Sequence, residues 1–407
     1  MSSPHPQTVT RRRVFYIPGY DPIHPRRYRE LYRKEGAAQA GISGYDLTLT
    51  PAAKGAHYGW HVDAVIDGAQ TRADVAVLVW SDIVRGSMAA SIPATYLQLV
   101  RTAWTYIASG ALRRLMRLRK GPVIAALYPV GMLLGQLLLA LLLWSLIWRL
   151  GGAVWPGPGA WIGAALGGAA FVAALRWFKA KDGKIFAYYL MHDYAYSAAA
   201  RGANPPALEA RMAAFADTIA EALREGADEV LVVGHSSGAH LAVSILADLI
   251  RAGRVPRDGP ALGFLSLGQV VPMVSFLPEA QRLRADLRYL SMRSELAWVD
   301  VTAPGDGCAF ALCDPVAVSG VAPEGKRWPL VFSAAFTQTL SPARWKALRW
   351  RFFRLHFQYL CAFDRPKDYD YFQITAGPVT LADRYADRPP SKSRIDVAVS
   401  KYTTVAA

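Results

Sequence analysis

The sequence predicts an α/β protein with a mostly parallel sheet flanked by helices, interrupted by a two-helix transmembrane hairpin. Short apolar runs rich in β-branched residues alternate along the 407-residue chain with segments whose apolar residues recur at helical spacing. Such alternation is typical of strand–helix units that build a parallel sheet. Two long apolar stretches interrupt the alternation before the middle of the chain, and no internal repeat occurs.

Residues 1–120 are expected to form the N-terminal part of the soluble domain. Its first strand is the apolar run Val14-Phe15-Tyr16-Ile17, which leads into the turn sequence Pro-Gly-Tyr-Asp-Pro. Further along, the pattern predicts a helix over 26–39, strands over 45–50 and 58–66, a buried strand over 73–80 and a helix over 93–118.

Residues 179–386 are expected to form the C-terminal part of the same domain. The pattern predicts a helix over 206–225, a strand over 229–233, a helix over 239–250, strands over 262–267 and 297–301, and a helix over 278–290. The tail 387–407 is polar, contains two prolines and is expected to be loosely ordered.

The hairpin is expected over residues 121–178. Its first stretch, 121–148, has no charged residue and is long enough to cross a hydrocarbon core of about 30 Å. The second and weaker helix follows a Gly/Pro turn and is expected over about 158–178. Small residues in it would allow close packing on the first helix (Gly163, Gly167, Gly168). Tryptophans near the helix ends could form aromatic belts (Trp144, Trp148, Trp155, Trp161, Trp177). The alternative, a pair of buried core helices, is disfavoured by the length and lack of charge.

The charge pattern indicates a bilayer as the partner. The formal net charge is +15, but no nucleic-acid-binding motif accompanies the basic residues, so no nucleic acid is expected. Basic residues flank the two apolar stretches on their outer sides, whereas the turn between them carries only Arg149. The positive-inside rule therefore predicts that the rest of the protein faces the cytoplasm at the inner membrane. The N-terminus lacks the long apolar run of a signal peptide, and the arginine- and alanine-rich composition is compatible with a bacterial source.

The three cysteines, Cys308, Cys313 and Cys361, are too few and wrongly spaced for a disulfide framework or a zinc site. They are expected to be buried thiols in a reducing compartment. No metal or cofactor is expected.

The strongest chemical motif is Gly234-His235-Ser236-Ser237-Gly238, which fits G-x-S-x-G and lies directly between a predicted strand and a predicted helix. In this setting Ser236 would sit on a strained turn, and side chains larger than glycine two residues away would clash with the adjacent strand and helix. The N-terminal amides of the helix would favour developing negative charge near the serine. Ser236 is therefore the predicted nucleophile.

With this motif and context, the chain resembles the α/β-hydrolase superfamily of serine esterases and lipases over roughly 12–82 and 184–362. The resemblance implies a triad in the chain order Ser, acid, His. Of the two histidines that follow Ser236, His240 lies only one turn further along the same helix, which leaves His356 as the predicted base. The predicted acid is Asp306, on the loop beyond a strand end, with Asp300 and Asp314 as alternatives.

The resemblance also implies an oxyanion hole made by the backbone N–H of Ser237 and one from an early loop. Gly19 and Tyr20 fit that loop, although they depart from the HGGG pattern of lipases. The basic and aromatic stretch 344–354 is expected either to lie on the membrane surface or to carry His356 into place. His192 and Asp193, near aromatic residues, are expected to pack in a turn, and pocket lining is the alternative.

Together these features predict a membrane-anchored serine hydrolase that cleaves a small-molecule or lipid ester through an acyl-enzyme. Acyl transfer to another acceptor and thioester hydrolysis use the same residues. A catalytically silent hydrolase fold that serves as a membrane scaffold is the alternative from a different functional class.

Overall fold

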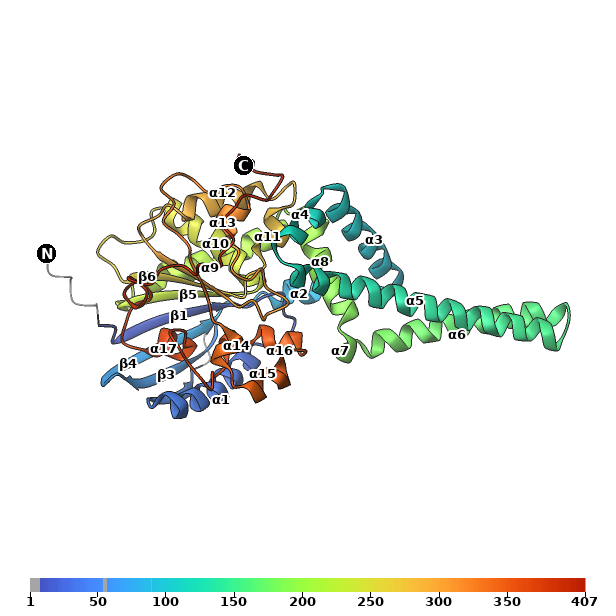
Figure 1. Ribbon diagram of the computed structural model, residues 1–407, viewed down its shortest axis with the longest axis horizontal. Helices are drawn as coiled ribbons and strands as arrows, with labels where there is room; N and C mark the ends of the chain where they lie inside the picture. Colours follow the sequence, from blue (N-terminus) through green and yellow to red (C-terminus); the bar gives the residue numbers. More distant parts are fainter. Residues whose placement is uncertain (1–7, 54–56, 89, 407) are drawn as a thin grey trace.

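A computed structural model describes residues 8–53, 57–88 and 90–406. The first seven residues, part of the segment in which no signal peptide is expected, therefore lie outside the described chain. The described residues form an α/β domain around one eight-stranded sheet in the order β2-β3-β4-β1-β5-β6-β7-β8 (Figure 1). The strands are β1 (Arg11–Ile17), β2 (Asp46–Pro51), β3 (Tyr58–Ile66), β4 (Ala69–Val77), β5 (Glu229–His235), β6 (Ala261–Leu267), β7 (Ala297–Thr302) and β8 (Leu330–Ser333).

The sheet is mostly parallel. The strands β4, β1, β5, β6, β7 and β8 pair with their neighbours in parallel, and only the β2–β3 and β3–β4 pairs are antiparallel. After β1 the chain crosses to β2 at one edge of the sheet and returns through β3 and β4. After β5 it continues on the opposite side through β6, β7 and β8. The carboxyl ends of β1 and β5 therefore meet at a topological switch point, which is where open α/β sheets bind ligands.

Helices cover both faces of the sheet. One face carries α9 (Pro206–Ala222), α10 (Ser237–Arg251) and α12 (Gln281–Leu290), and the other carries α1 (Arg26–Ser43) and α14 to α17 (Figure 1). Along β5, Val230 and Val232 enter the first core while Leu231 and Val233 enter the second. Because both faces are covered, the parallel strands are continuous apolar runs, as the sequence predicts for β5.

The remaining helices are short or belong to the region around the hairpin. They are α2 (Ser81–Met88), α3 (Ile92–Ala108), α4 (Ala111–Leu118), α5 (Lys120–Val154), α6 (Pro158–Ala180), α7 (Asp182–Ile185), α8 (Ala187–Ala199), α11 (Val271–Ser275), α13 (Pro315–Val318), α14 (Phe336–Thr339), α15 (Pro342–Leu348), α16 (Phe352–His356), α17 (Tyr371–Ala376) and α18 (Leu381–Arg384).

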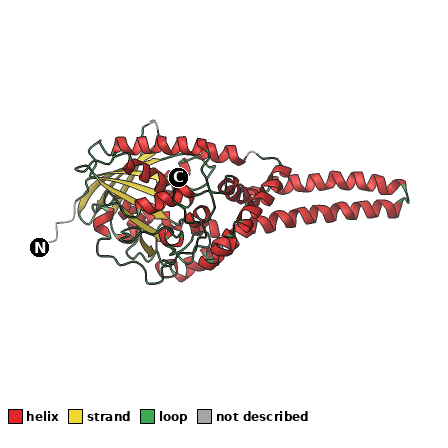
Figure 2. Cartoon of the chain, turned by 90° about the horizontal axis from the view of Figure 1, so that it is seen from above, coloured by secondary structure: helices red, strands yellow, loops and turns green. Residues whose placement is uncertain are grey.

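The two apolar stretches form an antiparallel helical pair, α5 and α6, that projects from the domain (Figures 1 and 2). Both helices are long and apolar enough to cross a membrane, and only 17% and 22% of their most apolar windows are buried. That exposure argues against buried core helices. The 35 residues of α5 span about 50 Å at ~1.5 Å per residue, more than a bilayer core requires. The first turns of α5 pack on α8 and belong to the soluble domain.

Glycines set the close contact between α5 and α6. A Cβ at Gly163 would lie 2.9 Å from the carbonyl oxygen of Ile147, and one at Gly167 would lie 2.8 Å from that of Trp144. The prediction of close packing is confirmed for these two positions. It is wrong for Gly168, which would meet nothing within 4 Å and therefore points away from α5.

The structure differs from the predicted elements in four places. The single helix predicted over 93–118 is two helices, α3 and α4, because the chain turns at Gly110, whose φ is 74°. The strand predicted over 73–80 is β4, which begins at Ala69 and ends at Val77. Sequence patterns missed α2, α8 and β8, which are short or lack clear periodicity. The tail is not loosely ordered: the Ile395 N–H donates to Leu312 O at 2.7 Å, and the Val399 N–H donates to Val318 O at 3.1 Å.

Candidate active site

Ser236 occupies a sharp turn between β5 and α10. Its φ of 56° and ψ of −123° lie in a backbone region that residues other than glycine rarely adopt. Such strain persists only where the surrounding structure imposes it, and it is characteristic of functional residues. The turn places the hydroxyl at the carboxyl edge of the sheet and at the first turn of α10.

The two glycines of the motif are required sterically, as the sequence predicts. A Cβ at Gly234 would lie 2.7 Å from Ala239 Cα in the following helix, and one at Gly238 would lie 2.1 Å from the carbonyl oxygen of Ile17 at the end of β1. The absence of these side chains lets β5, α10 and β1 approach closely. Ser236 is thereby held against the loop that follows β1, where a Cβ at Gly19 would lie 3.3 Å from Ser236 Oγ.

The predicted base and the preferred acid are paired. His356, the last residue of α16, places Nδ1 2.7 Å from Asp306 Oδ2, and both residues are buried. Burial alone would raise the pKa of Asp306, but its interactions with His356 and hydrogen bonds from Cys308 and Tyr359 hold the pKa below the usual value. The ionised carboxylate favours a proton on Nδ1 and leaves Nε2 of the neutral ring as the acceptor nitrogen.

The other candidates take structural positions. Asp300 lies inside β7, where it accepts a hydrogen bond from the Ser266 hydroxyl at 2.6 Å. Asp314 caps α13 and forms an ion pair with Lys326. His240 is buried in α10, one turn after Ser236, and burial lowers its pKa to about 4. None of the three contacts the His356–Asp306 pair through a hydrogen bond within the described residues.

Two residues that sequence reasoning missed hold this pair in place. His235, within the motif itself, contacts the backbone oxygen of His356 with Nε2 at 3.0 Å. Burial, followed by the charge of His356, lowers the pKa of His235 to about 3, so Nε2 donates this bond from a neutral ring. The Tyr359 hydroxyl donates to Asp306 Oδ2 at 3.0 Å and accepts from the Ala303 N–H. No sequence pattern marks Tyr359, because its role depends on a contact across 53 residues.

The two predicted oxyanion donors lie on either side of Ser236. Ser237 is the first residue of α10, and Tyr20 follows Gly19 in the loop after β1. Within the described chain, neither backbone N–H donates to another protein group. Both donors therefore remain available to an oxyanion beside Ser236. The loop is anchored on its other side, since Trp80 Nε1 donates to Pro18 O at 2.9 Å and the Tyr189 hydroxyl donates to Tyr20 O at 2.5 Å.

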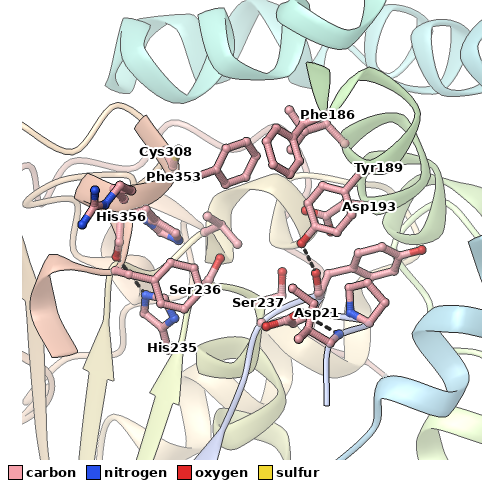
Figure 3. A pocket seen from close by; sticks show the side chains of 18 of the residues that line it. Asp21, Phe186, Tyr189, Asp193, His235, Ser236, Ser237, Cys308, Phe353 and His356 are labelled. Carbon is pink, nitrogen blue, oxygen red and sulfur yellow. Dashed lines mark hydrogen bonds between the residues drawn. The ribbon is translucent and has the colours of Figure 1, made fainter. Parts of the chain in front are cut away.

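Ser236 and His356 line the same cavity and point into it from neighbouring walls (Figure 3). Among the described residues no hydrogen bond joins Ser236 Oγ to the His356 ring. Catalytic hydrogen bonds are often long without substrate and shorten when it binds. Within the described residues the two side chains thus share a cavity, and the hydrogen bond expected between them is not formed.

The cavity has a volume of about 720 Å³ and extends from Ser236 toward the base of the hairpin. Its walls come from α1, α8, α16, the loop after β1 and the first turn of α5. Phe186 and Phe353 close the side nearest the hairpin with ring centroids 5.0 Å apart (Figure 3). Asp193, expected mainly to pack in a turn, lies instead in α8 and lines this cavity.

One group in the described residues could hold a metal ion. Ligand atoms of Asp306, Cys308 and His356 lie within 4.8 Å of one another. Metal ligation by cysteine requires the thiolate. Burial, reinforced by the charges of Asp306 and Asp193, raises the pKa of Cys308 well above its ordinary value. The Asp306–His356 hydrogen bond also engages Oδ2 and Nδ1, one possible ligand atom of each residue. The donor set therefore fits a Ser–His–Asp constellation better than a metal centre.

All three cysteines are free thiols, but Cys308 and Cys361 are only half-buried.

The site therefore combines a strained serine, a histidine–aspartate pair and two unused backbone donors at the sheet's switch point. Comparison with known proteins adds no assignment: no family model matches the chain, and neither does any curated protein or solved structure.

Proposed function

We propose that this protein is a membrane-anchored serine hydrolase of the α/β-hydrolase type that cleaves ester substrates through an acyl-enzyme. The observation that carries the proposal is that Ser236 and His356 line one cavity and that Asp306 is hydrogen-bonded to His356. These residues follow three different strands, β5, β8 and β7. Buried ion pairs are common in proteins, but this pair lies beside a serine with a strained backbone.

The chemistry follows from the geometry. His356 Nε2 takes the proton of Ser236 as Oγ attacks the ester carbonyl, and the N–H groups of Ser237 and Tyr20 stabilise the oxyanion. The protonated ring, stabilised by Asp306, then passes its proton to the departing alcohol, which leaves an acyl-enzyme. Water, deprotonated by the same nitrogen, attacks that acyl group and releases the acid and free Ser236.

The apolar surface of the protein supports a membrane location. In addition to α5 and α6, helix α3 exposes an apolar stripe on its outer face (Leu97, Val100, Trp104, Ile107), although it also buries Leu99 and Tyr106 beside Thr95 and Thr102. The exposed face of a helix in water is normally polar. Trp350, shortly before α16, and Phe352, its first residue, are also exposed among arginines. Basic flanks on both apolar helices favour a domain on the cytoplasmic side of the inner membrane.

The position of the cavity supports an ester with an apolar part. Pro122 of α5 lines the cavity together with Phe186 and Phe353, so apolar side chains form part of the wall nearest the hairpin. A substrate that reaches this wall from the adjacent leaflet would keep its apolar chain out of water. We therefore propose a lipid ester, or another ester delivered by the membrane.

A fluorophosphonate probe tests the enzymatic proposal. The full-length protein in detergent is expected to become labelled, and Ser236→Ala is expected to abolish the labelling. Ser237→Ala retains the backbone donor and serves as the control for loss of a neighbouring hydroxyl. Absence of labelling in a folded wild-type protein would instead support a catalytically silent scaffold.

Reconstitution tests the membrane delivery of substrate. A fluorogenic lipid ester in the same vesicles as the protein should be hydrolysed at least tenfold faster than one in separate vesicles. Turnover of short soluble esters without any action on the lipid ester would refute delivery from the bilayer and leave the hydrolase proposal intact.

A further inference from the structure

Asp193 is a carboxylate that the proposed reaction does not use, although it faces the reaction cavity. It lies in the middle of α8, on the wall across the cavity from His356 (Figure 3). It is half-buried and lines the same cavity as Ser236. Any substrate that places its carbonyl at Ser236 and extends toward α8 meets this side chain.

No protein group within the described residues forms a hydrogen bond or an ion pair with the Asp193 side chain. Burial raises the pKa of Asp193 to about 7, and the positive charge that His356 can carry opposes the rise. A carboxylate that is partly withdrawn from water and has no protein partner is stabilised by a ligand that brings a hydrogen-bond donor or a positive charge. The cavity thus contains an acceptor that a ligand can reach and that no described protein group occupies.

Three tyrosines of the cavity, Tyr20, Tyr106 and Tyr189, do not supply such a donor, because their hydroxyls donate to other groups. The Tyr106 hydroxyl donates to Met273 O at 2.9 Å, and that of Tyr189 donates to Tyr20 O. The Ser87 hydroxyl uses its hydrogen to donate to Val84 O. In the contact between Tyr20 and Ser87 the Tyr20 hydroxyl is therefore the donor, to Ser87 Oγ at 2.5 Å.

Tyrosines around Asp193 provide an electrostatic setting that favours a cation. Burial raises the pKa of Tyr106, Tyr189 and Tyr194, and the negative charge of Asp193 is the next cause for each, which places all three close to the carboxylate. Aromatic rings attract cations through their negative faces. Arg27, Lys34 and Arg354 also line the cavity, but within the described chain no lysine or arginine forms an ion pair with Asp193, and Arg27 is paired with Asp21. A carboxylate among aromatic rings suits a cationic ligand better than an anionic one.

We propose that Asp193 is a specificity-determining residue that binds an ammonium group of the substrate. The proposal rests on the proposed hydrolase function and narrows the substrate to esters that carry a cationic amine beyond the scissile carbonyl. The ammonium would donate hydrogen bonds to Asp193 and lie against the tyrosine rings while Ser236 attacks the ester.

Binding of two small probes tests this assignment without any need for catalysis. The full-length Ser236→Ala protein and the double variant with Asp193→Asn are titrated with n-butylammonium and with butan-1-ol, which has a similar size but carries a neutral hydroxyl donor. The cation is expected to bind Ser236→Ala at least tenfold more tightly than the alcohol does, and Asp193→Asn should remove that preference. Unchanged butan-1-ol binding in the double variant would show that the cavity is intact.

Equal affinity of Ser236→Ala for the two probes, or no measurable binding of the cation, would overturn the proposal. Retention of cation binding in the double variant would overturn it as well. Failure of the hydrolase proposal itself is seen separately, as a lack of fluorophosphonate labelling in the wild-type protein.

Discussion

Replacing Asp306 by asparagine would test the central pair of the site. The two carboxylate oxygens of Asp306 accept three hydrogen bonds, one at Oδ1 from the Cys308 N–H and two at Oδ2 from His356 and Tyr359. Asparagine keeps only one acceptor oxygen. If its NH₂ replaces Oδ1, it faces the Cys308 donor. If it replaces Oδ2, it faces the Tyr359 donor and forces His356 into the tautomer that cannot accept the serine proton.

The size of the effect follows from the burial of the pair. Removing one partner of a buried charge pair costs about 3–5 kcal/mol. The protonated His356 ring exists only as the reaction proceeds, so that loss falls on the transition state. At ~1.4 kcal/mol per tenfold change, the acylation rate should fall by roughly 10²–10⁴.

The rate of fluorophosphonate labelling, measured for the full-length protein in detergent, gives this loss directly. Asp300→Asn is the matched control, since it changes a buried aspartate that does not contact His356 and was the alternative acid. It should label within threefold of the wild-type rate. Labelling of Asp306→Asn at a near-wild-type rate, or a large loss in Asp300→Asn, would refute the assignment of Asp306.

Three further predictions concern stability. Gly238→Ala should destabilise the protein by about 1–3 kcal/mol or more in thermal unfolding, because its Cβ would overlap the Ile17 carbonyl oxygen. The control Gly41→Ala, in α1, has open space around the new Cβ and should be neutral or stabilising. Gly167→Ile should lower the unfolding temperature in detergent, and Gly168→Ile should not, since only the former Cβ meets α5. Burial raises the pKa of Asp300 to about 8, so this carboxyl contributes a loss of stability as pH rises from about 4 to 8, on the order of 5 kcal/mol at most, against the opposite contribution of His240, whose pKa burial lowers to about 4. Asp300→Asn should flatten that slope in unfolding at pH 5 and pH 8, and an unchanged slope would show that another group causes it.

The local parts of the site could be predicted from sequence because they depend on neighbours in the chain. The motif around Ser236 combines a strand, a tight turn and a helix within a few residues, and its two glycines are required by contacts that any such turn makes. The hairpin could be predicted because the absence of charge over a long stretch is a property of composition. His356 and Asp306 were named only with the help of a chain order implied by resemblance.

The sequence by itself determined where the strained serine and the two apolar helices lie, since backbone strain and hydrophobic length are local quantities. Only the tertiary structure decided that Asp306 rather than Asp300 meets His356, and that His235 and Tyr359 hold the pair. It also revealed that Asp193 faces the cavity without a hydrogen-bond or ion-pair partner among the residues that the structure describes. These facts depend on contacts between residues far apart in the chain, and such contacts exist only once the sheet is ordered and the helices cover it.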